Sequence, residues 1–185
     1  ENQSKDDRRK TIVLTGASRG IGHATVRRFS QGGWRVLTLS RQPFDDNCPW
    51  PEGAANHVQV DLADADSLGL AVADIRSRLE EEGGKLHALI NNAGIAPPRN
   101  ELKTDINMAN QMKRMEGRYD ELEPGNYTVD LSDEQWDRMI KIHLYGTFYG
   151  TRAALRHMTP QRSGSIVNIS SIMGLRPAAG APHYS

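Results

Sequence analysis

Short apolar segments alternate with longer segments of helical periodicity along this chain of 185 residues. The apolar segments are predicted to be buried strands at 11–15, 35–39, 57–60, 86–90 and 165–169. Helices are predicted from a glycine-rich turn to about residue 29, over 66–82, and from 133 to about 157. Strands that alternate with helices in this way indicate an α/β fold built from βαβ units around a parallel sheet.

Two segments depart from this alternation. Residues 42–56 contain three prolines and no helical period, so a loop is predicted where a βαβ unit normally has its helix. Residues 97–131 are polar, rich in Met and Asn, and long for a strand-to-helix connection, so they are interpreted as an insertion. A short helix is predicted within this insertion, with one face formed by Leu102, Ile106, Ala109 and Met112.

The longest predicted helix begins at a capping box. The pattern Ser132-Asp133-Glu134-Gln135 precedes an apolar run, and in such a box the first and last side chains satisfy free backbone amides. Apolar side chains then occur on more than one face of the helix, at Trp136, Met139, Ile140, Leu144, Tyr145, Phe148 and Tyr149. A monomer would expose part of this surface, so a homodimer or homotetramer is expected.

Composition narrows the classes of function. Lys+Arg and Asp+Glu both number 23, and this balance argues against a dedicated nucleic-acid binder. No apolar run is long enough to span a membrane, and residues 1–10 lack the apolar stretch of a signal peptide. The single cysteine, Cys48, fits a reducing compartment, so a cytoplasmic protein is expected. Residues 1–10, with Arg8-Arg9-Lys10, are interpreted as a solvated polar tail, and 11–185 as one domain.

A glycine-rich turn, Thr15-Gly16-Ala17-Ser18-Arg19-Gly20-Ile21-Gly22, separates the first strand from the first helix. Its glycines permit a tight turn and close approach of the backbone to a pyrophosphate, which the following helix N-terminus would bind through its amides. Asp61-Leu62 ends the third strand, and Asn91-Asn92-Ala93-Gly94 ends the fourth. Each segment alone could be an ordinary polar turn, but the three in this order favour a dinucleotide site.

These motifs together resemble the short-chain dehydrogenase/reductase superfamily. The resemblance implies a Rossmann-type doubly wound parallel sheet, truncated here at its C-terminal side, and an NAD(P) cofactor. It further implies that the pyrophosphate and ribose are lined by Gly16, Ser18, Arg19, Gly20, Ile21 and Gly22. By the same resemblance, Asp61 and Leu62 flank the adenine, and the nicotinamide-side ribose is near Asn92, Ala93 and Gly94.

The end of the second strand indicates which cofactor is preferred. Enzymes that use NAD place a carboxylate there to bind the ribose hydroxyls, whereas this chain has Ser40 followed by Arg41. A carboxylate would repel a 2′-phosphate, whereas the guanidinium groups of Arg41 and Arg19 can pair with it. The sequence therefore favours NADP(H), with NAD(H) possible. Both arginines could instead be merely exposed.

The family's chemistry depends on a Ser, a Tyr and a Lys four residues after the Tyr. Ser171 follows the fifth strand and Tyr184 lies thirteen residues later, which is the family's spacing; Ser170 is one residue too far. By resemblance, Ser171 orients the substrate oxygen and Tyr184 exchanges a proton with it. The chain ends before the lysine position, so we interpret it as part of a longer protein and expect residues 1–185 alone to be inactive.

His143 lies 28 residues before Ser171, where the family usually has Asn in a proton relay. It could relay protons itself or merely pack in the helix, and the sequence leaves both readings open. The implied function is an NADP(H)-dependent oxidoreductase, of the ketoreductase or 3-oxoacyl reductase kind, that acts on a small-molecule carbonyl or secondary alcohol. The alternative is a non-catalytic dinucleotide-binding sensor or scaffold, and neither reading involves a metal.

Overall fold

The structure is a computed structural model that describes residues 9–45, 48, 50, 52–81, 83–98, 102–177 and 180–184. Arg8 of the basic cluster lies outside the described residues. The chain divides into two compact units. The first contains Glu1–Gly94 and Lys141–Ile169, and the second contains Ile95–Ile140 and Ser170–Ser185. Each unit is described by itself below.

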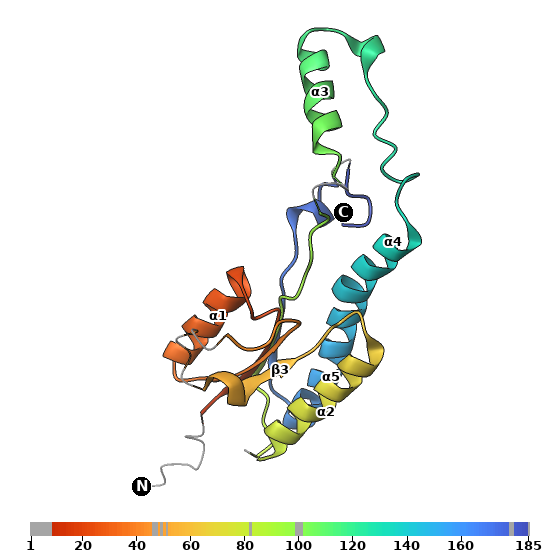
Figure 1. The fold of residues 1–185 in the computed structure, drawn as a ribbon. Helices are drawn as coiled ribbons and strands as arrows, with labels where there is room; N and C mark the ends of the chain where they lie inside the picture. The colour runs from red at the N-terminus through yellow and green to blue at the C-terminus, as the bar shows by residue number, and fades with distance from the viewer. Residues whose placement is uncertain are drawn as a thin grey trace. The chain divides into compact units, whose positions relative to one another are not determined.

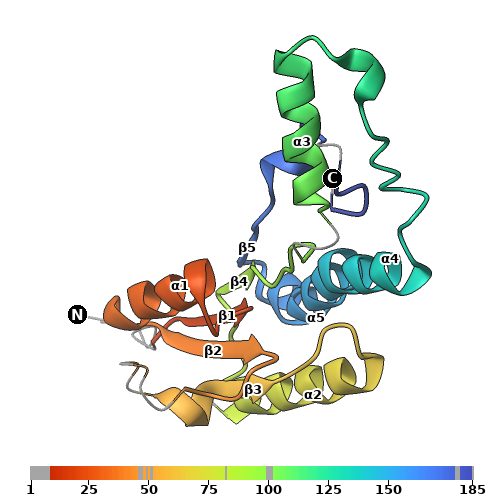
Figure 2. The same ribbon diagram turned by 45° about the horizontal axis from the view of Figure 1, so that its top comes forward.

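The first unit, whose helices α1, α2 and α5 are labelled in Figure 1, is built on a five-stranded, all-parallel sheet. The strand order is β3-β2-β1-β4-β5 (Figure 2). The strands are β1 Thr11–Thr15, β2 Arg35–Ser40, β3 His57–Gln59, β4 Ala88–Asn91 and β5 Ser165–Asn168. All five predicted strands are confirmed, with ends that differ by one or two residues. A Rossmann-type α/β sheet therefore follows from the sequence pattern.

Alternating side chains of the strands form two hydrophobic cores, one on each face of the sheet. Ile12 and Leu14 of β1 pack with Val26 of α1, which spans Gly20–Gln31. Val13, between them, packs on the opposite face with α2 (Ala65–Glu81) and α5 (Gly146–Gln161). Figure 2 shows α1 on one face and α2 and α5 on the other. Because both faces are covered, the central strands are buried at every position, which explains their continuous apolar sequences.

Where the structure describes it, the predicted loop between β2 and β3 has no regular structure other than a short 3-10 turn, Gly53–Asn56. It is anchored by aromatic side chains: Trp50 is buried and its ring centroid lies 5.8 Å from that of Phe44. Arg9 and Lys10 are exposed yet attached to the domain, since Arg9 donates hydrogen bonds to Gly33 O (2.9 Å) and Trp34 O (2.7 Å). Lys10 Nζ lies 5.5 Å from the Trp34 ring.

His57, at the start of β3, is held by two hydrogen bonds. Its Nε2 lies 3.0 Å from Gln42 O and its Nδ1 lies 2.9 Å from Thr38 Oγ1. A carbonyl can only accept, so Nε2 carries the proton and Nδ1 accepts from the threonine hydroxyl in the neutral ring. Burial lowers the pKa of His57; the bond to Gln42 opposes this, and the charge of Arg78 adds to the lowering.

This lowered pKa predicts a pH-dependent stability. Below the ordinary histidine pKa of about 6.5, the unfolded chain binds a proton at His57 more readily than the folded chain does. The stabilisation is therefore complete above that pH and is lost as the pH falls through the folded pKa. We expect the free energy of unfolding, measured with urea between about pH 5 and about pH 7.5, to depend less on pH in His57→Gln than in the wild type. Parallel pH profiles would contradict this.

The second unit contains most of the insertion. Its helix α3 spans Thr104–Met115, so the predicted short helix is confirmed. The returning segment is tied to α3 by polar contacts: Asn110 Nδ2 donates to Glu123 O (2.8 Å) and Glu123 N–H donates to Asn110 Oδ1 (2.9 Å). Tyr127 Oη donates to Asn107 Oδ1 (2.5 Å). The exposed apolar side chains of this helix are those of Met108, Met112 and Met115.

The predicted capping box is confirmed at the start of α4, Asp133–Ile140. Ser132 N–H donates to Gln135 Oε1 (2.8 Å), and Gln135 N–H donates to Ser132 Oγ (3.3 Å). A π-helical turn, Lys141–Tyr145, precedes α5 in the first unit. Met139 and Ile142 are buried, whereas the exposed apolar side chains of this region include Trp136, Leu144, Tyr145 and Phe148. Assembly through these exposed side chains stays a prediction.

Candidate cofactor and catalytic site

The glycine-rich turn lies at the point where the strand order reverses. β2 and β4 flank β1 on opposite sides, so the chain segments that leave β1 and β4 meet at the carboxyl edge of the sheet. Gly16 N–H donates to Leu39 O of β2 (2.7 Å), and the Ala17 amide approaches the same oxygen (3.4 Å). In open parallel sheets this reversal point is where ligands bind.

The Asn92 side chain joins the two predicted motifs. Its Nδ2 donates to Thr15 O (3.2 Å) and to Gly16 O (3.1 Å). Thr15 Oγ1 in turn accepts from the backbone amides of Asn92 and Ala93, both at 3.0 Å. The structure therefore brings together two motifs that are about 75 residues apart in the sequence, as the predicted parallel sheet requires.

Two glycines of the turn leave no room for a side chain. A Cβ at Gly22 would lie 2.0 Å from Gly16 O, and one at Gly16 would lie 2.7 Å from Ala93 Cα. Gly16 has φ +70°, a conformation that favours glycine. An ideal Cβ at Gly20, which has φ +55°, would meet no atom within 4 Å. The turn is therefore closely packed at Gly16 and Gly22 and open at Gly20.

The N-terminus of α1 is open in the same way. Arg19 occupies the N-cap position and provides no side-chain hydrogen bond to the first amides of the helix. Ile21, the second helical residue, is 65% exposed although it is apolar. Free amides beside an exposed apolar side chain fit a ligand that has both an anionic group and an apolar surface.

A cavity of about 350 Å³ lies beside this helix N-terminus and the end of β2. Its polar lining includes Ser18, Arg19, His23, Ser40, Gln42 and Asp45. Ser40 is buried, and its hydroxyl donates to Gln42 O (2.8 Å), so this hydroxyl already has a backbone partner. Arg41 is exposed at the next position. Among the residues that line this cavity, Asp45 supplies a carboxylate and Arg19 supplies a guanidinium.

The third predicted segment lies at the end of β3. Asp61 Oδ1 accepts from Ala63 N–H (2.9 Å), and Asp61 N–H donates to Ser67 Oγ (3.1 Å) at the start of α2. Leu62 is partly buried against the core that α2 and α5 cover. Asp61 and Leu62 therefore also organise the entry to α2, and their contact with an adenine stays a prediction.

His143 lies in the π-helical turn, directly against the asparagine-rich motif. A Cβ at Gly94 would come within 2.9 Å of His143 Cε1, so the imidazole covers this glycine. Single π-turns inside helices occur frequently at functional sites. His143 therefore contacts the predicted cofactor motif, and its two roles considered from the sequence, packing and proton relay, both stay predictions.

Ser171 and Tyr184 belong to the second unit. Ser171 Oγ accepts from Met173 N–H (3.2 Å) and caps the 3-10 turn Ile172–Gly174. Tyr184 is half-buried, and the Gly180–Ala181 turn before it is buried. An ideal Cβ at Gly180 would lie 3.4 Å from Tyr127 Cε1, so this turn contacts the insertion. The catalytic roles of both residues stay predictions.

Two residues of the predicted motifs were given no role of their own from the sequence. Thr15 supplies the hydroxyl that bonds Asn92 and Ala93, and Asn91 connects β4, α5 and β5. Asn91 Nδ2 donates to Thr151 Oγ1 (3.1 Å) and to Asn168 Oδ1 (2.9 Å). A signal was available for Asn91, because a buried amide at the end of an apolar strand requires hydrogen-bond partners.

Within the described part of the chain, no group of three His, Cys, Asp or Glu side chains is arranged to hold a metal ion. The helices described here are all too short or too polar to cross a bilayer.

An open parallel sheet with a glycine-rich turn at its reversal point defines a Rossmann-type α/β protein. A family model described as short chain dehydrogenase matches residues 10–116 and 122–185. This chain therefore belongs to the short chain dehydrogenase family, as the sequence motifs predicted.

Several known proteins are similar to the chain. Protein FixR of Bradyrhizobium diazoefficiens is 38% identical over 186 residues, which cover 94% of this chain and 55% of that protein. The 3-oxoacyl-acyl-carrier-protein reductase FabG of Thermotoga maritima is 28% identical over 181 residues, with 95% and 61% coverage. The chain thus spans only part of these curated relatives.

A solved structure is similar over nearly the whole chain. It is a short chain dehydrogenase/reductase family oxidoreductase from Brucella ovis in complex with a partially ordered NAD. The two structures match with a TM-score of 0.74 at 39% identity, and the match covers 96% of this chain and 70% of the other.

Proposed function

We propose that the protein is an NADP(H)-dependent oxidoreductase that transfers a hydride between the nicotinamide and a carbonyl or secondary alcohol. The observation that carries the proposal is the glycine-rich turn, hydrogen-bonded to Asn92 at the reversal point of the sheet. The membership in the short chain dehydrogenase family supports it. The NAD of the Brucella ovis structure supports a nicotinamide cofactor.

The residues of the turn fit such a cofactor. The open space at Gly20 and the uncapped amides of α1 suit a pyrophosphate, because the helix dipole and free N–H groups favour negative charge. Ile21 offers an exposed apolar surface beside them. We assign the cavity beside Ser18, Arg19 and Ser40 to the adenosine end of the cofactor.

The preference for NADP(H) follows from the charges at the end of β2. Ser40 stands where enzymes that use NAD have a carboxylate, and Arg41 follows it directly. Arg19, in the glycine-rich turn, lines the same cavity as Ser40. A 2′-phosphate pairs with guanidinium through charge-assisted hydrogen bonds. Asp45 in the same cavity lining opposes this attraction in part.

Arg41→Ala tests the cofactor preference. We expect this change to weaken NADPH binding by about 1–3 kcal/mol, roughly tenfold to a hundredfold, and to leave NADH binding nearly unchanged. Binding is measured by fluorescence titration of both cofactors. Arg162→Ala, which removes an exposed arginine after α5, is the matched control and should change neither affinity. Equal losses for NADPH and NADH in Arg41→Ala would remove Arg41 from the phosphate site.

The proposed chemistry assigns one role to each side chain of the motif. A bound nicotinamide supplies or accepts the hydride. Ser171 donates a hydrogen bond to the substrate oxygen and orients it. Tyr184 gives its proton to that oxygen during reduction and takes it back during oxidation. The whole activity is tested by ketone-dependent oxidation of NADPH with the full-length protein and a panel of ketones that includes a 3-oxoacyl thioester.

A non-catalytic dinucleotide-binding protein is the second candidate. The observation that favours it is His143, which contacts Gly94 where the family usually has an asparagine. A protein of this second kind would bind NADPH in the fluorescence titration but would oxidise it with none of the ketones. The two candidates are therefore separated by binding without turnover.

A further inference from the structure

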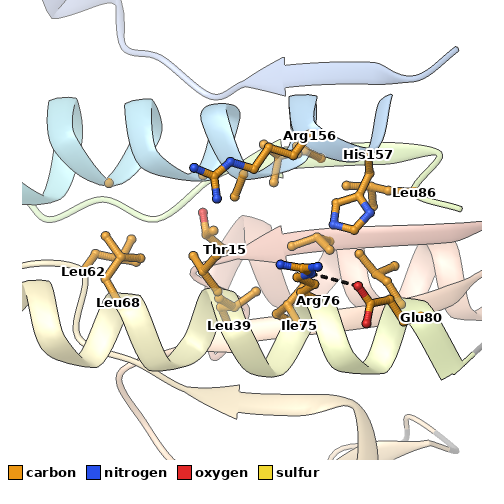
Figure 3. Close-up of a pocket in the computed structure, with 18 residues that line it drawn as sticks. Thr15, Leu39, Leu62, Leu68, Ile75, Arg76, Glu80, Leu86, Arg156 and His157 are labelled. Atoms are coloured by element: carbon orange, nitrogen blue, oxygen red, sulfur yellow. Dashed lines mark hydrogen bonds and ion pairs between the residues drawn. The ribbon is translucent and has the colours of Figure 1, made fainter. Parts of the chain in front are cut away.

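A second cavity lies between α2 and α5 on the opposite side of β1 from α1. It has a volume of about 420 Å³, and all its lining residues belong to the first unit. Its floor is formed by the sheet, with Val13, Leu39 and Leu89, and its walls by apolar residues of the two helices. Figure 3 shows Leu62 and Leu68 at one end and Leu86 at the other.

This cavity is too large to be ordinary packing. Protein interiors are close-packed, and the voids that they contain rarely exceed the size of a water molecule. Ligand pockets, by contrast, are apolar hollows of roughly 300–1,000 Å³ with a few polar groups at defined places. The walls on α5 are lined by small residues, Gly150, Ala153 and Ala154, which leave the space open.

The charged side chains of this cavity come from the two helices that form its walls. His157 of α5 lies opposite Arg76 and Glu80 of α2, whereas the guanidinium of Arg156 is directed along α5 toward Thr15 (Figure 3). Arg76 Nε is paired with Glu80 Oε1 at 2.8 Å. Among the described residues, the side chains of Arg156 and His157 form neither a hydrogen bond nor an ion pair. The mouth of an apolar cavity therefore carries an uncompensated guanidinium and an imidazole with free nitrogen atoms.

We propose that this cavity is a binding site for a medium-chain carboxylate, with its alkyl chain between α2 and α5 and its carboxylate on the guanidinium of Arg156. An apolar interior fits the chain, and the unpaired guanidinium fits the head group through charge-assisted hydrogen bonds. With each methylene taken to fill about the volume of a water molecule, roughly 30 Å³, the cavity has room for about fourteen carbons, so a decanoate chain fits within it.

A smaller cavity adjoins the cavity between α2 and α5. It has a volume of about 260 Å³, and four residues line both cavities: Leu68, Val72, Ala153 and Arg156. Arg152 also lines it, with its guanidinium carbon 4.9 Å from the centroid of the Tyr149 ring. The guanidinium groups of Arg152 and Arg156 together make the entrance positively charged, which favours an anionic ligand over a neutral one.

The test is isothermal titration of sodium decanoate into the full-length protein, with 1-decanol and butanoate as comparison ligands. We expect saturable binding of decanoate at one site, and weaker binding of butanoate because it buries fewer methylenes. Arg156→Gln should weaken decanoate about tenfold and leave 1-decanol unchanged, whereas Arg162→Gln should change neither. The effect of Arg156→Gln should diminish at high salt.

A second variant tests the apolar part of the site. Ala153→Phe places a ring in the cavity and should abolish binding of both decanoate and 1-decanol, while circular dichroism confirms that the variant is folded. The proposal is overturned if decanoate does not bind to the wild type, or if Arg156→Gln and Ala153→Phe both bind decanoate as tightly as the wild type does. It is also overturned if light scattering shows that Ala153→Phe dissociates an oligomer, because a second copy then occupies the cavity. These readouts need neither NADPH nor a ketone and are independent of the proposed enzymatic function.

Discussion

Gly22→Ala is expected to lower NADPH affinity by at least a hundredfold and to destabilise the fold by about 1–3 kcal/mol. The new Cβ would lie 2.0 Å from Gly16 O and 2.7 Å from Asn92 Nδ2. Neither atom can rotate away. Gly16 O belongs to the backbone, and Asn92 Nδ2 is held by hydrogen bonds to Thr15 O and Gly16 O. The glycine-rich turn must therefore separate from the asparagine-rich motif, and the proposed phosphate site is lost.

Gly69→Ala is the matched control for this glycine. Gly69 lies inside α2, and an ideal Cβ there meets no atom within 4 Å. Because alanine favours the helix over glycine, this change should stabilise the fold by about 0.5–1 kcal/mol and leave NADPH binding intact. Urea unfolding and fluorescence titration measure the two effects. Wild-type affinity in Gly22→Ala would mean that the cofactor binds elsewhere.

Tyr184→Phe is expected to reduce kcat for ketone reduction by about 10²–10⁴-fold, because general acid–base catalysis contributes a factor of that size. The ring and its packing remain, so NADPH affinity should stay within about twofold of the wild type, and the loss should appear in kcat. Steady-state kinetics of the full-length protein with NADPH and a ketone provide the measurement. A kcat near that of the wild type would show that Tyr184 is not the proton donor.

Two comparisons separate a chemical role from a structural one. Tyr119 is exposed in the 3-10 turn Tyr119–Glu121, so Tyr119→Phe should leave kcat unchanged. Ser171→Ala should lower kcat, whereas Ser170→Ala, one position away and off the family's spacing, should not. If Ser171→Ala changes only stability, the bond from Met173 N–H to Ser171 Oγ accounts for the serine, and its role is structural.

The sequence alone determined the features that depend on near neighbours in the chain. The five strands, the helix of the insertion and the capping box at Ser132 are each specified by residues within a few positions of one another, through side-chain alternation, helical periodicity and local hydrogen bonds. The parallel sheet then placed the strand ends at one edge, so the meeting of Gly16 and Asn92 was also predictable. The motifs were sufficient to identify the family.

The tertiary structure decided what depends on how helices pack over the sheet. The sheet order predicts that Asn92 lies near Gly16, but the choice of Thr15 O and Gly16 O as its hydrogen-bond partners depends on tertiary packing. The same packing places His143 over Gly94, 49 positions earlier in the chain, which the sequence did not predict. The cavity between α2 and α5 was equally unpredictable. Its walls consist of Leu, Val, Ile, Ala and Gly residues that a sequence marks only as core, and whether such residues fill the space or leave it open is decided by the distance between the two helices.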